Sequence, residues 1–160
     1  MTNVPWILGV VAALLHAAGY VIYNIQTKKK DSTPNAVSWF IWALMAWLNA
    51  SSFTGVTDVP HALQYMVGTF AAIATFLLAL RWKRFDWPDP LEWGVLVLCL
   101  ASMGLWYRYQ NASLANATLL IPFLISFWPM FDGVRRDPYK EKALAWWIWT
   151  AAFAVNLANN

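Results

Sequence analysis

"TPNAVSWFIWALMAWLNA" (Thr33–Ala50) and "EKALAWWIWTAAFAVNLA" (Glu141–Ala158) are two stretches of one chain that share the same features. Each is apolar, rich in tryptophan, and carries one asparagine near its far end. Of the 160 residues in the chain, 60% are hydrophobic and only 12% are charged. A water-soluble domain of this size has too high a surface-to-volume ratio to bury so many apolar side chains. The composition therefore predicts an all-α integral membrane protein.

Six transmembrane helices are predicted from the apolar blocks. Their approximate bounds are Val4–Tyr23, Ala36–Phe53, His61–Trp82, Leu91–Tyr107, Leu114–Phe131 and Leu144–Leu157. Some of these blocks are shorter than the ~20 residues that a straight span prefers, so tilt or a thin bilayer is expected to help.

The basic residues predict the orientation of these helices. Ten of the eleven Lys and Arg residues fall in alternate connections, and only Arg108 falls on the other side. The ten are Lys28, Lys29, Lys30, Arg81, Lys83, Arg84, Arg135, Arg136, Lys140 and Lys142. By the positive-inside rule these three connections are cytoplasmic and both termini face outward. We expect a multi-pass protein of the bacterial inner membrane, in contact with the lipid bilayer.

The two tryptophan-rich stretches belong to a longer match. A shift of 107 residues aligns Trp39 with Trp146, Ile41 with Ile148, Trp42 with Trp149, Asn49 with Asn156, and the pair Lys28–Lys29 with Arg135–Arg136. Both stretches run in the same direction through the membrane. The sequence therefore predicts a parallel internal repeat, in which helices 1–2 and 5–6 are related by an axis along the membrane normal.

The repeated spacing also predicts a binding site. Residues seven apart in a helix lie about two turns apart on nearly the same face. Trp42 and Asn49 therefore share one face, and so do Trp149 and Asn156. Two amides and two indoles facing one axis would form a small polar pocket with aromatic walls, suited to an uncharged polar or ring-shaped ligand. In the alternative interpretation, each asparagine only hydrogen-bonds a neighbouring helix and holds the bundle together.

Other chemistry is weakly represented in the sequence. The single cysteine, Cys99, cannot form an intrachain disulfide or a thiolate metal cage. The two histidines, His16 and His61, lie at different predicted depths and do not make a metal site. No nucleophile elbow, phosphate loop or zinc-ligand pattern is present. We expect neither an enzyme nor a cofactor or metal, and the net charge of +3 gives no reason to expect a nucleic-acid partner.

Two segments carry a resemblance to a known family, "YNIQTKKKDSTPNAVSWFIW" (Tyr23–Trp42) and "WPMFDGVRRDPYKEKALAWWIW" (Trp128–Trp149). They resemble the PQ-loop and SWEET/SemiSWEET superfamily of small membrane transporters, whose three-helix unit has a short basic loop and then a helix opening like Ala36-Val37-Ser38. Pro129-Met130 resembles the Pro-Gln of the family, with Met in place of Gln. The first unit has no Pro-Gln, and no seventh helix follows helix 6.

The resemblance implies an organisation and a function. Residues 1–160 would form a single membrane domain, with a first three-helix unit (1–82), a linker helix (83–110) and a partial second unit (111–160). The family carries solutes such as sugars or amino acids by alternating access, through Trp and Asn residues from both units. Trp42, Asn49, Trp149 and Asn156 are the corresponding candidates here, and a homo-oligomer could replace the seventh helix. The alternative function is a non-transporting accessory subunit of a larger membrane complex, with its Trp-rich helices packed against protein, lipid, quinone or pigment.

Overall fold

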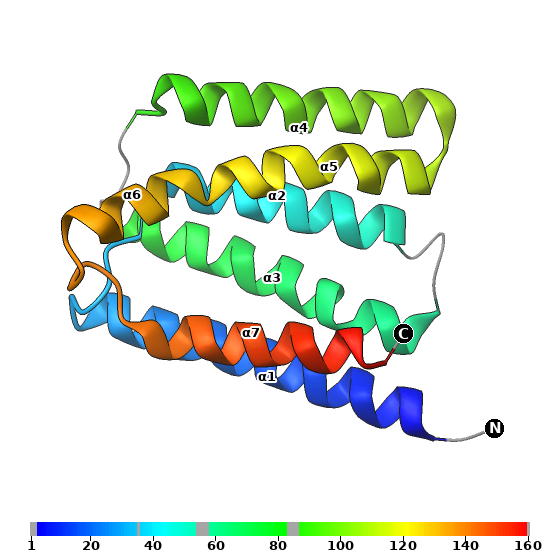
Figure 1. Ribbon diagram of the computed structural model, residues 1–160, viewed down its shortest axis with the longest axis horizontal. Coiled ribbons are helices and arrows are strands. Elements are labelled where there is room, and N and C mark those ends of the chain that lie inside the picture. The colour runs from blue at the N-terminus through cyan, green and yellow to red at the C-terminus, as the bar shows by residue number, and fades with distance from the viewer. Residues whose placement is uncertain (1–2, 35, 54–57, 83–86, 160) are drawn as a thin grey trace.

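A computed structural model describes residues 3–34, 36–53, 58–82 and 87–159. The described part of the chain is helical and contains no β-strand. The helices are α1 (Val4–Lys28), α2 (Ala36–Phe53), α3 (Val59–Arg81), α4 (Pro90–Tyr109), α5 (Ala112–Ser126), α6 (Trp128–Arg136) and α7 (Ala143–Leu157) (Figure 1). The all-helical prediction is therefore confirmed.

Each predicted span corresponds to helix in the structure. α2 has the predicted bounds, and α1 continues past the predicted end at Tyr23 to Lys28. Four helical segments are long and apolar enough to cross a membrane, and α2 and α7 are shorter apolar helices. Those four segments are Val4–Lys28, Ala62–Arg81, Pro90–Tyr109 and Ser113–Arg136. The structure therefore has the length and hydropathy expected of a membrane protein.

The predicted span Leu114–Phe131 differs from the structure, which breaks it at Phe127 and extends it to Arg136. Pro129 occupies the first turn of α6, where its missing N–H costs least and its ring does not clash with a preceding helical turn. α6 therefore begins as a new helix, and Arg135 and Arg136 lie in its last turn and not in a connecting loop.

The helices pack side by side in two linked groups. α3 packs against both α1 and α2, which contact each other through the rings of Tyr20 and Tyr23 on α1 and Trp39 on α2. α7 packs mainly against α1, and α5 packs against α2 and α4. α4 also contacts α2, so it covers the outer side of the bundle at the top of Figure 1.

Small residues allow the close approach of α1 and α3. The carbonyl of Pro60 lies where a Cβ on Gly9 would stand, so only glycine fits at that position. Ala12 on α1 and Ala72 on α3 are fully buried. Lipid tails are as apolar as these side chains, so close backbone packing stabilises helix pairs in a bilayer where hydrophobic burial cannot.

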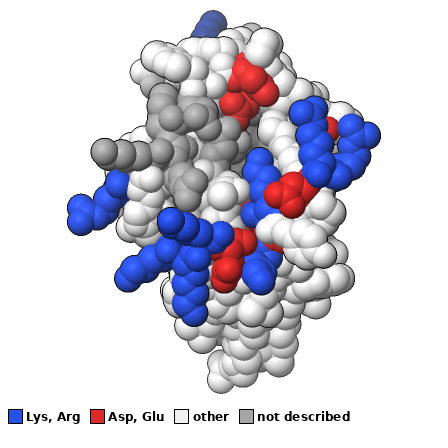
Figure 2. All heavy atoms as spheres, turned by 90° about the vertical axis from the view of Figure 1, so that its left-hand side faces the viewer, with Lys and Arg blue, Asp and Glu red and all other residues white. Residues whose placement is uncertain are grey.

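The last turns of α1, α3 and α6 and the first turns of α2, α4 and α7 lie at one end of the bundle (Figure 1). Viewed from that end, blue Lys and Arg side chains cover a large part of the surface (Figure 2). We call this the basic end. Lys83 and Arg84, which were predicted to belong to it, lie outside the described residues, as do residues 1 and 160 at the ends of the predicted domain.

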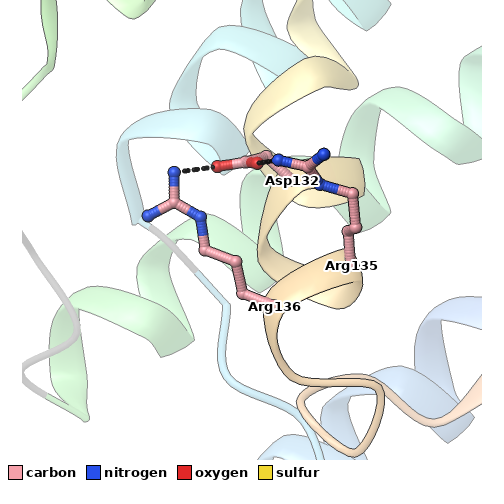
Figure 3. A network of polar contacts seen from close by, with 3 residues as sticks. All are labelled: Asp132, Arg135 and Arg136. Carbon is pink, nitrogen blue, oxygen red and sulfur yellow. Dashed lines mark hydrogen bonds and ion pairs between the residues drawn. The ribbon is translucent and has the colours of Figure 1, made fainter.

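Red Asp and Glu side chains lie among these cations (Figure 2). Asp132 on α6 lies between the guanidinium groups of Arg135 and Arg136, at 3.2 and 2.7 Å (Figure 3). Both arginine side chains are exposed, so each ion pair contributes ~1 kcal/mol or less to stability. The pairs orient the last turn of α6 without neutralising the basic end.

Candidate functional site

Four of the six tryptophans in the two similar stretches form one cluster, which we call the tryptophan tetrad. Trp39 and Trp42 come from α2, and Trp146 and Trp149 come from α7. Within each helix the ring centroids are 4.9 and 5.0 Å apart. Across the two helices, Trp39–Trp149 are 6.1 Å apart and Trp42–Trp146 are 6.0 Å apart. Pairs at equivalent positions of the match therefore have nearly equal separations.

The indole N–H groups of the tetrad reach across the bundle in an equivalent way. Trp149 donates from Nε1 to the backbone carbonyl of His16 on α1, at 3.2 Å. Trp42 donates from Nε1 to Oγ of Ser126 on α5, at 2.8 Å. Gly19, which the shift of 107 residues aligns with Ser126, lies against Trp149, because a Cβ built there would be 2.5 Å from Nε1. The two indoles therefore contact α1 and α5 at positions that the shift of 107 residues aligns.

A cavity of about 410 Å³ lies beside the tetrad. Its lining comes from five helices and from Phe127 between α5 and α6. The lining residues are His16, Tyr20, Trp39, Trp42, Met45, Ala46, Asn49, Tyr65, Gly68, Asn116, Leu119, Leu120, Phe123, Phe127, Trp146, Trp149, Thr150 and Phe153. The walls are mostly aromatic and aliphatic with a few polar groups, which is the usual character of a small-molecule site.

Three of the four predicted site residues line this cavity, namely Trp42, Asn49 and Trp149. Asn156 does not line it. Its side chain is only 3% exposed and hydrogen-bonds that of Tyr65 on α3, which does line the cavity. The structure therefore brings two indoles and one amide together, and it puts the second amide behind a tyrosine.

The polar wall formed by α1 and α3 was not among the predicted site residues. The buried side chain of Gln64 donates from Nε2 to Nδ1 of His16, at 3.1 Å. A neutral His16 with Nδ1 as acceptor carries its proton on Nε2, and this nitrogen lies beside Gly68 in the cavity wall. His16 stands out in the sequence as a polar residue within a span, but its partner is 48 residues away along the chain, so no local pattern could identify it.

A second, smaller cavity of about 150 Å³ lies toward the basic end. Trp39, Trp42 and Trp146 line both cavities, so the tetrad lies between them. The small cavity also has polar lining residues, including Lys140 and Glu141.

Glu141 is the partly buried acid of the small cavity. Tyr23 at the cavity wall donates from its hydroxyl to Oε1 of Glu141, at 3.3 Å. Burial raises the pKa of Glu141, while hydrogen bonds from Ser32, Tyr23, the Thr33 backbone and Trp146 oppose that rise. The site therefore holds a carboxyl group that accepts a proton more readily than one in water.

Among the described residues, no group of three His, Cys, Asp or Glu side chains could hold a metal ion, and the side chain of His61 lies outside the described part. Cys99 is buried in the core formed by α2, α4 and α5. No family model, curated protein or solved structure matches the chain.

Proposed function

We propose that the chain is a six-span membrane protein with an internal parallel repeat, its basic end in the cytoplasm and both termini outside. The helix contacts support the repeat. Exchanging α1 with α5–α6 and α2 with α7 turns the α1–α7 contact into the α5–α2 contact, and both contacts are present. The matched geometry of the tetrad supports the same two-fold relation.

We propose further that the protein binds an uncharged, ring-bearing solute in the 410 Å³ cavity and carries it by alternating access. The observation that carries this function is the joint lining of one cavity by Trp42, Asn49 and Trp149. Indole faces stack on flat rings, and a side-chain amide offers two N–H donors and one carbonyl acceptor. A charged solute would lose much of its hydration here without an opposite charge to pair with, so the lining favours a neutral one.

The tetrad supports the transport half of the proposal. It separates the large cavity from the small cavity at the basic end, and it joins α2 and α7, one helix from each repeat. A rocking motion of the two repeats would change the Trp39–Trp149 and Trp42–Trp146 contacts and connect the two cavities. In this mechanism the tetrad is the cytoplasmic gate of the pathway.

Binding and flux measurements test this function together. The purified chain in lipid nanodiscs is titrated with a hexose, a nucleoside and a hydroquinone while its tryptophan fluorescence is followed. At least one class should bind, and Asn49→Ala should weaken that binding ~2–10-fold, the equivalent of one net hydrogen bond. The bound compound should then exchange across proteoliposomes that contain the protein. Affinities unchanged in Asn49→Ala would contradict the proposed site.

An accessory subunit is the second candidate, and one observation favours it. α7 has large apolar side chains that the other described helices leave uncovered. Trp147 is 71% exposed and Leu157 is 75% exposed. Such a face suits either lipid or a partner protein. Binding without flux, together with co-purification in a fixed ratio with a larger complex, would select this function over transport.

A further inference from the structure

The large cavity has an uncovered side between α5 and α7. The backbones of α1 and α2 do not pack closely, although Tyr20 and Tyr23 contact the ring of Trp39, and α3 packs against both helices. The backbones of their counterparts in the repeat, α5 and α7, also do not pack closely. α2 packs against α5 and reaches α7 through the tetrad, and no described helix packs its backbone closely against both α5 and α7. In Figure 1, α5 and α7 pass in front of the bundle, with α3 behind them. The cavity wall that α3 closes in the first repeat is therefore open in the second.

The exposure of the lining residues locates this opening. Leu120 on α5 is 56% exposed and Phe153 on α7 is 43% exposed, although both line the cavity. His16, Trp39 and Trp149 line the same cavity and are less than a tenth exposed. Leu120 and Phe153 thus form the rim of what we call the lateral opening, and the other three residues lie at its depth.

The rim lies at mid-height in the bundle. Leu120 is eight residues from the start of α5, which corresponds to about 12 Å along the helix axis. Phe153 is ten residues from the start of α7, or about 15 Å, measured from the basic end. The hydrocarbon core of a bilayer is about 30 Å thick. A chain that spans the bilayer as proposed would therefore open this cavity to the lipid tails and not to water.

Most of the polar lining residues come from α1, α2 and α3, while α5 and α7 contribute Asn116 and Thr150. The imidazole of His16, the hydroxyl of Tyr65 and the amide of Asn49 come from α1, α3 and α2, away from the opening. The rim is a leucine and a phenylalanine, and Thr150 beside them donates its hydroxyl to the backbone carbonyl of Trp146 at 2.9 Å. A ligand that fits this arrangement has a polar end that is placed deep and an apolar end that points to the bilayer.

We infer that the ligand is an amphipathic, uncharged molecule with a hydrogen-bonding ring and an apolar tail, and that it enters from the bilayer through the lateral opening. This inference rests on the proposed function, because it names the ligand class of that site. The ring lies between the indoles near Asn49 and His16. The tail passes between Leu120 and Phe153 into the surrounding lipid.

The test uses two tritiated probes with the same head group. One is a dimethoxybenzoquinone that carries a decyl chain, and the other is the same quinone without the chain. Binding to nanodisc-embedded protein is measured for the wild type, Leu120→Trp and Ile121→Trp. Ile121 is the matched control, because it is 58% exposed on the same helix and does not line the cavity. Comparing variants at one lipid concentration cancels the partitioning of the tailed probe into the bilayer.

The two variants should separate the probes. We expect Leu120→Trp to weaken binding of the tailed probe at least tenfold and binding of the tail-less probe less than twofold. Ile121→Trp should bind both probes with wild-type affinity. Phe153→Trp on the opposite side of the rim should repeat the result and replaces Leu120→Trp if that variant does not fold. Equal effects of Leu120→Trp on both probes, or none on either, would overturn lateral entry.

Other outcomes distinguish the two levels of the proposal. If both probes bind and both are weakened by Asn49→Ala, but the rim variants do not discriminate, then the site stands and lateral entry fails. If neither probe is affected by Asn49→Ala, the proposed site itself fails. A nitroxide spin label is attached to Leu120→Cys in a Cys99→Ala background. Its electron spin resonance line should be broadened by dissolved oxygen and not by a water-soluble nickel chelate. Protection from both agents would mean that another protein helix fills the opening, and this too would overturn the inference.

Discussion

Replacing Gly19 with alanine tests how closely the tetrad is fitted to α1. The new Cβ would lie 2.5 Å from Nε1 and 2.6 Å from Cδ1 of Trp149. Carbon atoms prefer separations of ~3.5–4 Å, so the indole must move by about 1 Å. This movement lengthens the hydrogen bond from Nε1 to the His16 carbonyl, which is already 3.2 Å long.

The size of the effect follows from three contributions. Overpacking a filled interior costs ~1–3 kcal/mol, and losing the indole hydrogen bond costs ~0.5–1.5 kcal/mol. Alanine is better than glycine inside a helix by ~0.5–1 kcal/mol, which offsets part of that loss. We therefore expect Gly19→Ala to lower the free energy of unfolding by about 1–3 kcal/mol. Ligand affinity should fall as well, because Trp149 lines the cavity.

Gly104→Ala is the matched control for this change. Gly104 lies within α4, and a Cβ built there meets nothing within 4 Å. Only the helix-propensity gain remains, so this variant should be as stable as the wild type or more stable by ~0.5–1 kcal/mol. Denaturant unfolding in micelles, followed by near-ultraviolet circular dichroism of the tryptophans, gives both values. If Gly19→Ala were as stable as Gly104→Ala, the contact between α1 and the tetrad would be refuted.

Three further predictions concern the two cavities. Burial raises the pKa of Glu141 above its ordinary value of 4.5, so the folded chain binds this proton more tightly than the unfolded chain does. The resulting contribution to stability is full below pH 4.5 and is lost as the pH rises through the folded pKa. Glu141→Gln should remove this part of the pH dependence from melting curves recorded from pH 4 upward, and a pH profile identical to that of the wild type would contradict the prediction. Asn49→Ala should weaken ligand binding by ~0.5–1.5 kcal/mol, because Asn49 lines the cavity. Asn156→Ala should lower the melting temperature, because its amide hydrogen-bonds Tyr65 and does not line the cavity; weaker ligand binding in Asn156→Ala but not in Asn49→Ala would contradict these roles. Trp42→Phe removes the 2.8 Å hydrogen bond from Nε1 of Trp42 to Oγ of Ser126, so it should lower the free energy of unfolding by at least ~0.5–1.5 kcal/mol. A double-mutant cycle with Ser126→Ala should give a coupling energy of that size, whereas additive effects would mean that the hydrogen bond contributes nothing to stability.

The helices were predictable from the sequence because their signal is local. Apolar runs with Pro or polar residues at their ends define α2 and α4 almost to the residue. The break at Phe127 was not predictable in the same way. Pro122 and Pro129 are both prolines in one apolar run, yet α5 continues through Pro122, whereas Pro129 lies in the first turn of a new helix, α6, which begins at Trp128. Which proline ends a helix depends on packing around it, and that packing involves distant segments.

The site was predictable only as far as the repeat determines it. The seven-residue spacing of Trp42 and Asn49, and of Trp149 and Asn156, predicted two indoles and two amides around one pocket, and Trp42, Asn49 and Trp149 line the large cavity. The two asparagines have the same spacing but different surroundings. α3 packs against α7 and brings Tyr65 to Asn156, whereas Asn49 lines the cavity. α3 lies outside the matched segments, so the match could not predict this difference.

Native mass spectrometry of protein extracted from its own membranes tests the central claim most directly, namely that the large cavity holds an uncharged small molecule. Ala46→Trp fills the cavity from α2, and Val97→Trp adds the same side chain to the 61% exposed outer face of α4 as a control. We expect the wild type and Val97→Trp to carry one small-molecule adduct per chain, and Ala46→Trp, folded to the same extent, to carry none. An adduct that persists in Ala46→Trp, or its absence from all three proteins, would contradict the claim.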